Sequence, residues 1–220
     1  MIIDCISDLH GEEPELSGGD LLIIAGDLTA RDAAFQHIKF LLWLDNQKYK
    51  KKIFISGNHD QIIERMGCSS KTLPENTEYL CDSGTEFEGF KIWGSPWTHL
   101  FEGVNPNCTA FMIPEEKLDE KWDLFPEEID ILITHSPPFG ILDEAQEHIP
   151  ALPYAKSFKR CGSKSLCHKI LTRPQISLHV FGHIHESYGK TQNQWGGISV
   201  NASIMNRNYE SINKPIRIIL

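Results

Sequence analysis

The stretch SLHVFGHIHE, residues 177–186, places His183 and His185 two positions apart, directly after a short apolar run. Such a run, ending at a glycine, is typical of a strand that is buried on both faces. Gly182 allows the backbone to approach a neighbouring group closely. Taken alone, the two histidines could be buried structural residues, so their meaning depends on the rest of the chain.

Four other apolar runs carry polar residues at or just after their ends. The runs and their polar residues are 1–7 with Asp8, 20–26 with Asp27, 51–57 with Asn58, and 130–136 with His135. Two further runs, 196–203 and 215–220, predict strands near the C-terminus. In open α/β sheets the carboxyl ends of the strands form the edge at which ligands bind. We therefore expect these polar side chains to meet there.

Helical patterns separate several of the strands. The expected helices begin at Thr29, near Asp60, near Pro114 and at Ser163. The first extends to about residue 47 and places Phe35, Ile38, Leu41 and Leu42 on one face. Strands alternating with helices indicate βαβ units, which here give way to adjacent strands. The expected fold class is therefore α/β (α+β).

Length and charge limit the possible functions. A chain of 220 residues is expected to form a single domain, 1–220. The 21 Lys and Arg against 30 Asp and Glu give a net charge of −9, which argues against an extended nucleic-acid partner. No signal-peptide pattern follows Met1, and no apolar run approaches the length of a membrane span. A cytoplasmic protein with reduced cysteines and no membrane partner is expected.

The polar residues at the strand ends form a mixed set of nitrogen and oxygen ligands. The set comprises two carboxylates, one amide and four imidazoles: Asp8, Asp27, Asn58, His10, His135, His183 and His185. It suits Mn²⁺, Fe or Zn²⁺ better than Ca²⁺ or Mg²⁺. Seven ligands are too many for one ion, but they can serve two ions that share a carboxylate, as in centres that clamp a reacting phosphoryl group.

Five short blocks follow one another along the chain: DLH at 8–10, GD at 26–27, GNHD at 57–60, His135 and GHIH at 182–185. In this order they resemble the calcineurin-like metallophosphoesterase superfamily. Further strings are similar to its metallophosphoesterase-domain-containing group. They are KIWGSPW at 91–97, THSPPFG at 134–140, LHVFGHIHESYG at 178–189 and NAS at 201–203. The resemblance implies two β-sheets packed as a sandwich and flanked by helices.

The resemblance also implies a role for each matching residue. Asp8, His10 and His185 would bind the first metal ion. Asn58, His135 and His183 would bind the second ion. Asp27 would bridge the two. His59 would not be a ligand but would protonate the leaving oxygen, with Asp60 orienting its imidazole.

The charges suggest how such a site would act. Two divalent ions, two carboxylates and a bridging hydroxide leave a local charge of about +1, which attracts an anionic phosphate ester. The hydroxide would attack phosphorus in line while His59 protonates the leaving alkoxide. Manganese is the expected metal, with iron or zinc as alternatives.

The expected enzyme is a phosphodiesterase acting on small phosphodiesters such as 2′,3′-cyclic nucleotides, the substrates that similarity to the narrower group favours. Two alternatives stay open: a phosphomonoesterase or protein phosphatase, because the same centre serves both, and a nucleotide-binding scaffold with little turnover. Asn58, His59 and Trp97 are expected to contact substrate, the last by stacking on a base. Substrate-shaping residues, including His99 and His148, could also lie in the long loops 96–128 and 137–163.

Overall fold

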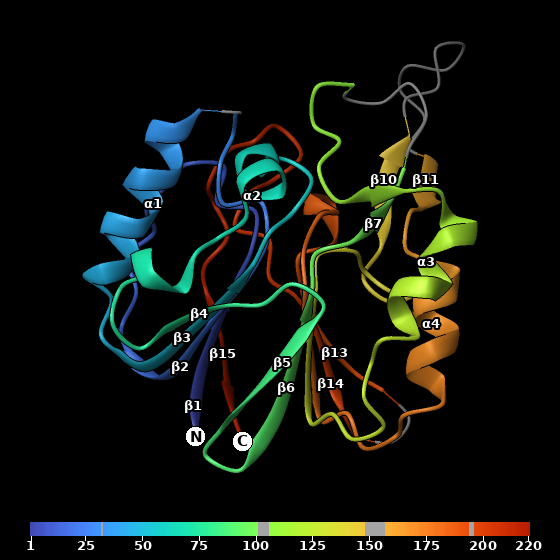
Figure 1. Ribbon diagram of the computed structural model, residues 1–220. Coiled ribbons are helices and arrows are strands. Elements are labelled where there is room, and N and C mark those ends of the chain that lie inside the picture. Colours follow the sequence, from blue (N-terminus) through green and yellow to red (C-terminus); the bar gives the residue numbers. More distant parts are fainter. Residues whose placement is uncertain (32, 101–105, 148–156, 194–195) are drawn as a thin grey trace.

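The computed structural model describes residues 1–31, 33–100, 106–147, 157–193 and 196–220. Two main sheets lie side by side, as Figure 1 shows. Helix α1 (Ala34–Asp45) flanks one sheet, whereas α3 (Glu115–Trp122) and α4 (Lys164–Leu171) flank the other. The short helix α2 (Gln61–Met66) follows the third strand. This arrangement confirms the expected fold class.

The first sheet has the strand order β15-β1-β2-β3-β4. Its strands are β1 (Ile2–Ile6), β2 (Gly19–Ala25), β3 (Tyr49–Ile55), β4 (Thr77–Tyr79) and β15 (Ile216–Ile219). Strands β1 to β4 run parallel, and β15 is antiparallel to β1. The carboxyl ends of the parallel strands therefore point to one edge.

The second sheet has the order β13-β14-β12-β9-β6-β5. Its strands are β5 (Ser83–Phe87), β6 (Phe90–Ser95), β9 (Ile131–Thr134), β12 (Leu178–Phe181), β13 (Gly189–Gln192) and β14 (Ile198–Asn201). The four central strands are parallel, and the edge strands β5 and β13 are antiparallel. The remaining short elements are β7 (Thr98–His99), β8 (Met112–Ile113), β10 (Glu144–Glu147), β11 (Ser157–Arg160), η1 (Ser70–Thr72) and η2 (His185–Ser187).

A hydrophobic core joins the inner faces of the two sheets, and further clusters lie under the helices. In β2, Leu21 and Ile23 belong to the core between the sheets, while Leu22 and Ile24 belong to the cluster under α1. All four side chains are fully buried. The prediction of strands buried on both faces is confirmed. Within the described residues, no helix is both long and apolar enough to cross a membrane.

Helix α1 differs from the prediction in its start and in its buried face. The helix begins at Ala34 with Ala33 as its N-cap. The Thr29 hydroxyl, the predicted cap, lies instead 3.0 Å from the Asp60 carboxylate and 3.2 Å from the His59 carbonyl oxygen. The core side of the helix is formed by Phe40, Trp43 and Leu44.

The apolar face predicted for α1 is wrong. Phe35, Ile38 and Leu42 are exposed, and Leu41 is half-buried. Two faces of this helix carry apolar side chains at helical spacing, so periodicity alone could not decide between them. The ring of Phe40 lies 5.3 Å from the ring of Phe54 on β3. Phe40 therefore belongs to the face of α1 that packs on the sheet.

The hairpin β5–β6 was not predicted as two strands. Strand β5 lies at the edge of its sheet and is only partly buried, so its sequence SGTEF has no continuous apolar run. Glu88 and Gly89 form the turn, both with positive φ. An edge strand of this kind gives a weak sequence signal.

Substitution of each of the two phenylalanines of α1 tests which face of the helix stabilises the fold. Phe40→Ala, at a side chain 4% exposed, is expected to lower the free energy of unfolding by about 3–5 kcal/mol. The matched control Phe35→Ala removes the same atoms from a side chain 66% exposed and should change it by about 0.5 kcal/mol or less. Urea unfolding followed by circular dichroism measures both. Equal losses would contradict the packing described for α1.

Candidate metal centre

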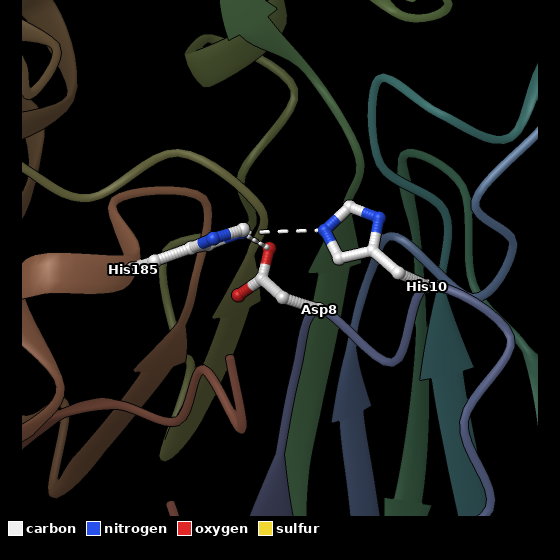
Figure 2. Close-up of side chains that lie close together, drawn as sticks. All are labelled: Asp8, His10 and His185. Atoms are coloured by element: carbon white, nitrogen blue, oxygen red, sulfur yellow. Dashed lines mark hydrogen bonds and ion pairs between the residues drawn. The ribbon is translucent and has the colours of Figure 1, made fainter. Parts of the chain in front are cut away.

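The first group of ligands joins the loop after β1 to the turn after β12. Figure 2 shows Asp8 and His10 facing His185. The imidazole Nε2 of His185 lies 3.6 Å from Asp8 Oδ1 and 3.3 Å from His10 Nε2. The carbonyl oxygen of Asn206 lies 3.2 Å from His185 Nδ1, which directs the other ring nitrogen into the site. Three ligand atoms therefore converge on one region.

Asp27, directly after Gly26 at the end of β2, lies between this group and a second one. Its Oδ1 accepts a hydrogen bond of 2.8 Å from the backbone nitrogen of His59. Its Oδ2 lies 3.4 Å from His135 Nε2, 3.8 Å from His10 Nε2 and 4.0 Å from His59 Nε2. One carboxylate oxygen is thus surrounded by three imidazoles.

The second group lies on the side of β9. His135 Nε2 is 3.1 Å from Asn58 Oδ1, and the rings of His135 and His183 are 5.0 Å apart. The Ala25 carbonyl oxygen lies 2.9 Å from His135 Nδ1 and fixes the ring. The structure therefore brings Asn58, His135 and His183 together on one side of Asp27.

Ligand atoms close enough to hold a metal ion occur in three groups within the described part of the chain. The groups are Asp8–His10–His185, His10–Asp27–His59 and Asp27–His135–His183, each with ligand atoms within 4.8 Å of one another. Asp27 and His10 each belong to two of them, and of the two only Asp27 is a carboxylate, whose two oxygens can serve two ions. His59 also falls within a group, although the sequence predicted no ligand role for it.

The backbone at this site has an unusual conformation. Asp8, His10, Asp27 and His183 have φ values of 55°, 45°, 52° and 69°. Positive φ is uncommon outside glycine, and strained residues of this kind cluster at functional sites. Four of the seven candidate ligands therefore have this left-handed backbone conformation.

Two glycines allow the loops to approach the ligands. A β-carbon at Gly182 would lie 2.1 Å from Ser7 Oγ and 2.3 Å from Asp8 Oδ2. At Gly57 it would lie 2.3 Å from Asp27 Oδ1. No real β-carbon tolerates such distances, so both positions require glycine. At Gly182 this close approach lets the next residue, His183, donate its backbone N–H to the Asp8 carboxylate.

The carboxylates of the site are held in the ionised form. Burial opposes ionisation of Asp8, but the hydrogen bond and charge of His185 and the charge of His135 outweigh it and lower its pKa to about 2. Burial likewise opposes ionisation of Asp27, yet the positive charges of His135 and His59 hold its pKa well below the ordinary value. Two negative charges are thus buried together.

The imidazoles differ in charge. Burial lowers the pKa of His10 to about 4 and that of His183 to about 3, so both are neutral near pH 7. Burial also disfavours the charged form of His135, but the neighbouring Asp27 carboxylate raises its pKa to about 9. Neutral imidazole and ionised carboxylate are the forms that bind metal ions, and binding would release the proton of His135.

The residues present fit two divalent ions. Two buried carboxylates need compensating positive charge, and the imidazoles around them offer nitrogen ligands without any thiolate. Asp8, His10 and His185 could hold one ion, and Asn58, His135 and His183 the other, with Asp27 between them.

The expected pairing of Asp60 with the His59 imidazole is corrected by the structure. The Asp60 carboxylate accepts hydrogen bonds from the backbone nitrogens of Leu28, Thr29 and Gly57 and from the Thr29 hydroxyl. His59 Nδ1 instead lies 3.3 Å from the Ala30 carbonyl oxygen. Backbone N–H groups of two loops donate to the Asp60 carboxylate. Asp60 therefore links these two loops and does not orient the His59 imidazole.

Trp97 also differs from its expected place as an open stacking wall. Its indole nitrogen donates to Asp82 at 2.8 Å, and the Lys121 ammonium lies 3.9 Å from its ring centroid. The side chain packs with the cluster around α3. His99 lies near α3 as well, with Nδ1 3.8 Å from Glu115. His148 lies outside the described residues.

Two residues near the site carry no signal in the sequence. Asn206 contacts His185 through its backbone carbonyl oxygen. The ring of Tyr209 lies 4.9 Å from the ring of His10 and 4.9 Å from that of His185. Neither residue sits at the end of a strand run, and a carbonyl contact is independent of side-chain type. No motif spacing could have indicated them.

Known proteins resemble the chain over most of its length. Metallophosphoesterase domain-containing protein 1 of Homo sapiens, and the Mus musculus protein of that name, are 38% identical over 98% of this chain and 70% of their own. A UPF0046 protein of Caenorhabditis elegans is 32% identical over 96% of this chain and 78% of its own.

A solved crystal structure with 15% identity covers 91% of this chain and 89% of its own with a TM-score of 0.61, a likeness of fold. The family model of the calcineurin-like phosphoesterases matches residues 1–187. That range contains every ligand position described above. The chain belongs to the calcineurin-like phosphoesterase family.

Proposed function

We propose that the protein is a metal-dependent phosphodiesterase that hydrolyses small phosphodiesters such as 2′,3′-cyclic nucleotides. The observation that carries the proposal is the position of Asp27, whose carboxylate belongs to two ligand groups at once. Two metal ions that share a ligand are characteristic of phosphoryl-transfer centres. The net charge of −9 favours a small anionic substrate over a long polyanion.

The ligand residues have a role that follows from their charges. Asp8, His10, His185 and Asp27 would hold one ion, and Asp27, Asn58, His135 and His183 the other. When bound, two divalent ions supply activation of water near neutral pH and stabilisation of charge on the phosphoryl oxygens. The mixed nitrogen and oxygen ligands favour Mn²⁺, with iron or zinc as alternatives.

His59 is the proposed general acid. Its Nδ1 faces the Ala30 carbonyl, which can only accept a hydrogen bond, so Nδ1 carries a proton. Nε2 is directed towards Asp27, at 4.0 Å from Oδ2. The oxygen of a water molecule forms the new bond to phosphorus, the bond from phosphorus to the ester oxygen breaks, and the proton on Nε2 passes to the departing alkoxide. The proton that the attacking water loses goes to solvent, from which Nε2 is protonated again. The product is a phosphomonoester.

Asp60 is a positioning residue in this proposal. It binds the backbone of Leu28 and Thr29 on one loop and of Gly57 on the other. The same loops carry Asp27 and His59, which are joined by their own hydrogen bond. Asp60 therefore fixes the distance between the shared ligand and the proton donor without touching the substrate.

Activity assays test the proposed function directly. Protein loaded with Mn²⁺ is expected to cleave bis-p-nitrophenyl phosphate and a 2′,3′-cyclic nucleotide, and to lose both activities when a chelator removes the metal. Diester turnover should exceed that of p-nitrophenyl phosphate. If neither diester is cleaved faster than in the metal-free control, the proposal is wrong. Faster cleavage of the monoester than of the diesters would indicate a phosphomonoesterase.

A comparison of Asp27→Asn and Asp60→Asn separates the shared ligand from the positioning residue. Asp27→Asn removes the charge between the two ligand groups, so the metal content should fall from two ions per chain to one or none. Asp60→Asn should keep two ions and lose about 10–100-fold in kcat, as is typical when a residue that supports a ligand is changed. Metal analysis after gel filtration, together with initial rates, measures both effects. Unchanged metal content in Asp27→Asn would contradict the assignment.

The role of His59 depends on the leaving group. His59→Ala should slow hydrolysis of a 2′,3′-cyclic nucleotide, whose alkoxide needs a proton, by about 10²–10⁴-fold. Hydrolysis of bis-p-nitrophenyl phosphate should fall much less, because p-nitrophenolate leaves without protonation. Metal content serves as the control, since His59 also lies within one of the three groups. Equal losses on both substrates, with metal lost, would make His59 a ligand instead.

A further inference from the structure

Tyr209 lies beside three of the site histidines although it comes from the C-terminal part of the chain. Its ring centroid is 4.9 Å from those of His10 and His185 and 6.4 Å from that of His59. The residue is 50% exposed, so part of it faces solvent next to the site. The proposed mechanism uses none of its atoms.

The loop that carries Tyr209 is held in one conformation. The Asn206 side-chain oxygen accepts hydrogen bonds from the backbone nitrogens of Asn208, at 2.8 Å, and Glu210, at 3.0 Å. The Tyr209 nitrogen donates to the Asn206 carbonyl oxygen at 3.0 Å. That same carbonyl oxygen contacts His185. The loop 206–210 therefore contacts His185, a candidate metal ligand, through the Asn206 carbonyl oxygen.

Tyr209 itself has a φ of 59°, in the left-handed region. This conformation is uncommon for a bulky residue, whereas asparagine and glycine adopt it readily. A strained residue persists where the surrounding structure holds it, and such residues gather at ligand sites. The strain places a large aromatic ring where the backbone alone would favour a small residue.

The position of the ring relative to His59 indicates what it could contact. The proton donor must lie next to the ester oxygen that leaves, and in a 2′,3′-cyclic nucleotide that oxygen belongs to the ribose. The base attached to that ribose would therefore lie within one sugar's length of His59. The Tyr209 ring is 6.4 Å from the His59 ring and 4.9 Å from the rings of His10 and His185, so such a base could reach it.

We propose that Tyr209 forms the wall on which the base of a nucleotide substrate stacks, making the site selective for phosphodiesters that carry a planar aromatic group. This inference rests on the proposed function. Stacking needs a rigid aromatic face and tolerates any base. The selectivity is therefore for the presence of a base rather than for its identity.

Two substitutions separate this role from simple packing against the histidines. Tyr209→Phe keeps the ring. Tyr209→Asn removes it but suits the left-handed backbone, so the loop is kept. The matched control is Phe35→Leu, which replaces a 66% exposed aromatic side chain on α1. Metal content should be the same in all of them.

The substrates are 2′,3′-cyclic AMP and methyl riboside 2′,3′-cyclic phosphate, which has the same phosphodiester and sugar but no base. The ratio of kcat/KM for the first to that for the second should fall by about 5- to 100-fold in Tyr209→Asn. The ratio should stay within about 3-fold of the wild-type value in Tyr209→Phe and Phe35→Leu. Equal losses on both substrates in Tyr209→Asn would overturn the proposal and leave Tyr209 a packing residue.

A binding measurement keeps this test separate from the proposed function. Calorimetry of the Mn²⁺-loaded protein compares AMP with ribose 5-phosphate and needs no turnover. If the protein hydrolyses neither cyclic phosphate, the proposed function fails. The inference about Tyr209 then stands only if Tyr209→Asn weakens AMP binding by about 5- to 100-fold and leaves ribose 5-phosphate unchanged. Equal affinity of the wild-type protein for the two ligands, or binding of neither, would overturn it.

Discussion

The structure depends on the buried carboxylate of Asp27. A charge buried away from water is costly unless hydrogen bonds and opposite charges compensate for it. The His59 backbone nitrogen satisfies one oxygen, and the imidazoles of His10, His59 and His135 surround the other. These partners come from three loops, at the ends of β1, β3 and β9, and Asp27 itself follows β2. The parallel strands are what bring those loops to one place.

The two sheets meet at this edge as well as in the core between them. Asp8 follows a strand of the first sheet, and its carboxylate accepts a hydrogen bond from His183, which follows a strand of the second. Gly182 makes this approach sterically possible. A ligand group that draws from both sheets couples the metal centre to the way in which the sheets pack. Asp8, His10, Asp27 and His183 have positive φ, a strained conformation that gathers at functional sites.

The sequence predicts which polar side chains meet at the strand ends, because apolar strand runs and their polar ends are local features. It also predicts parallel strands that are buried on both faces. It fails where two local patterns compete, as on α1, whose exposed face carries Phe35 and whose buried face carries Phe40. It also fails for Asp60, because the proximity of backbone N–H groups from separate loops is a product of tertiary folding. Tyr209 and Asn206 could not be found for the same reason: their contacts with the site are long-range.

In the proposed centre, two metal ions share Asp27, with one ligand group on either side of it. The most direct test is a crystal structure of the Mn²⁺-loaded protein with anomalous diffraction measured at the manganese edge. We predict two anomalous peaks about 3.5–4 Å apart, with the Asp27 carboxylate bound to both. A single peak, or two peaks of which only one contacts Asp27, would contradict the account.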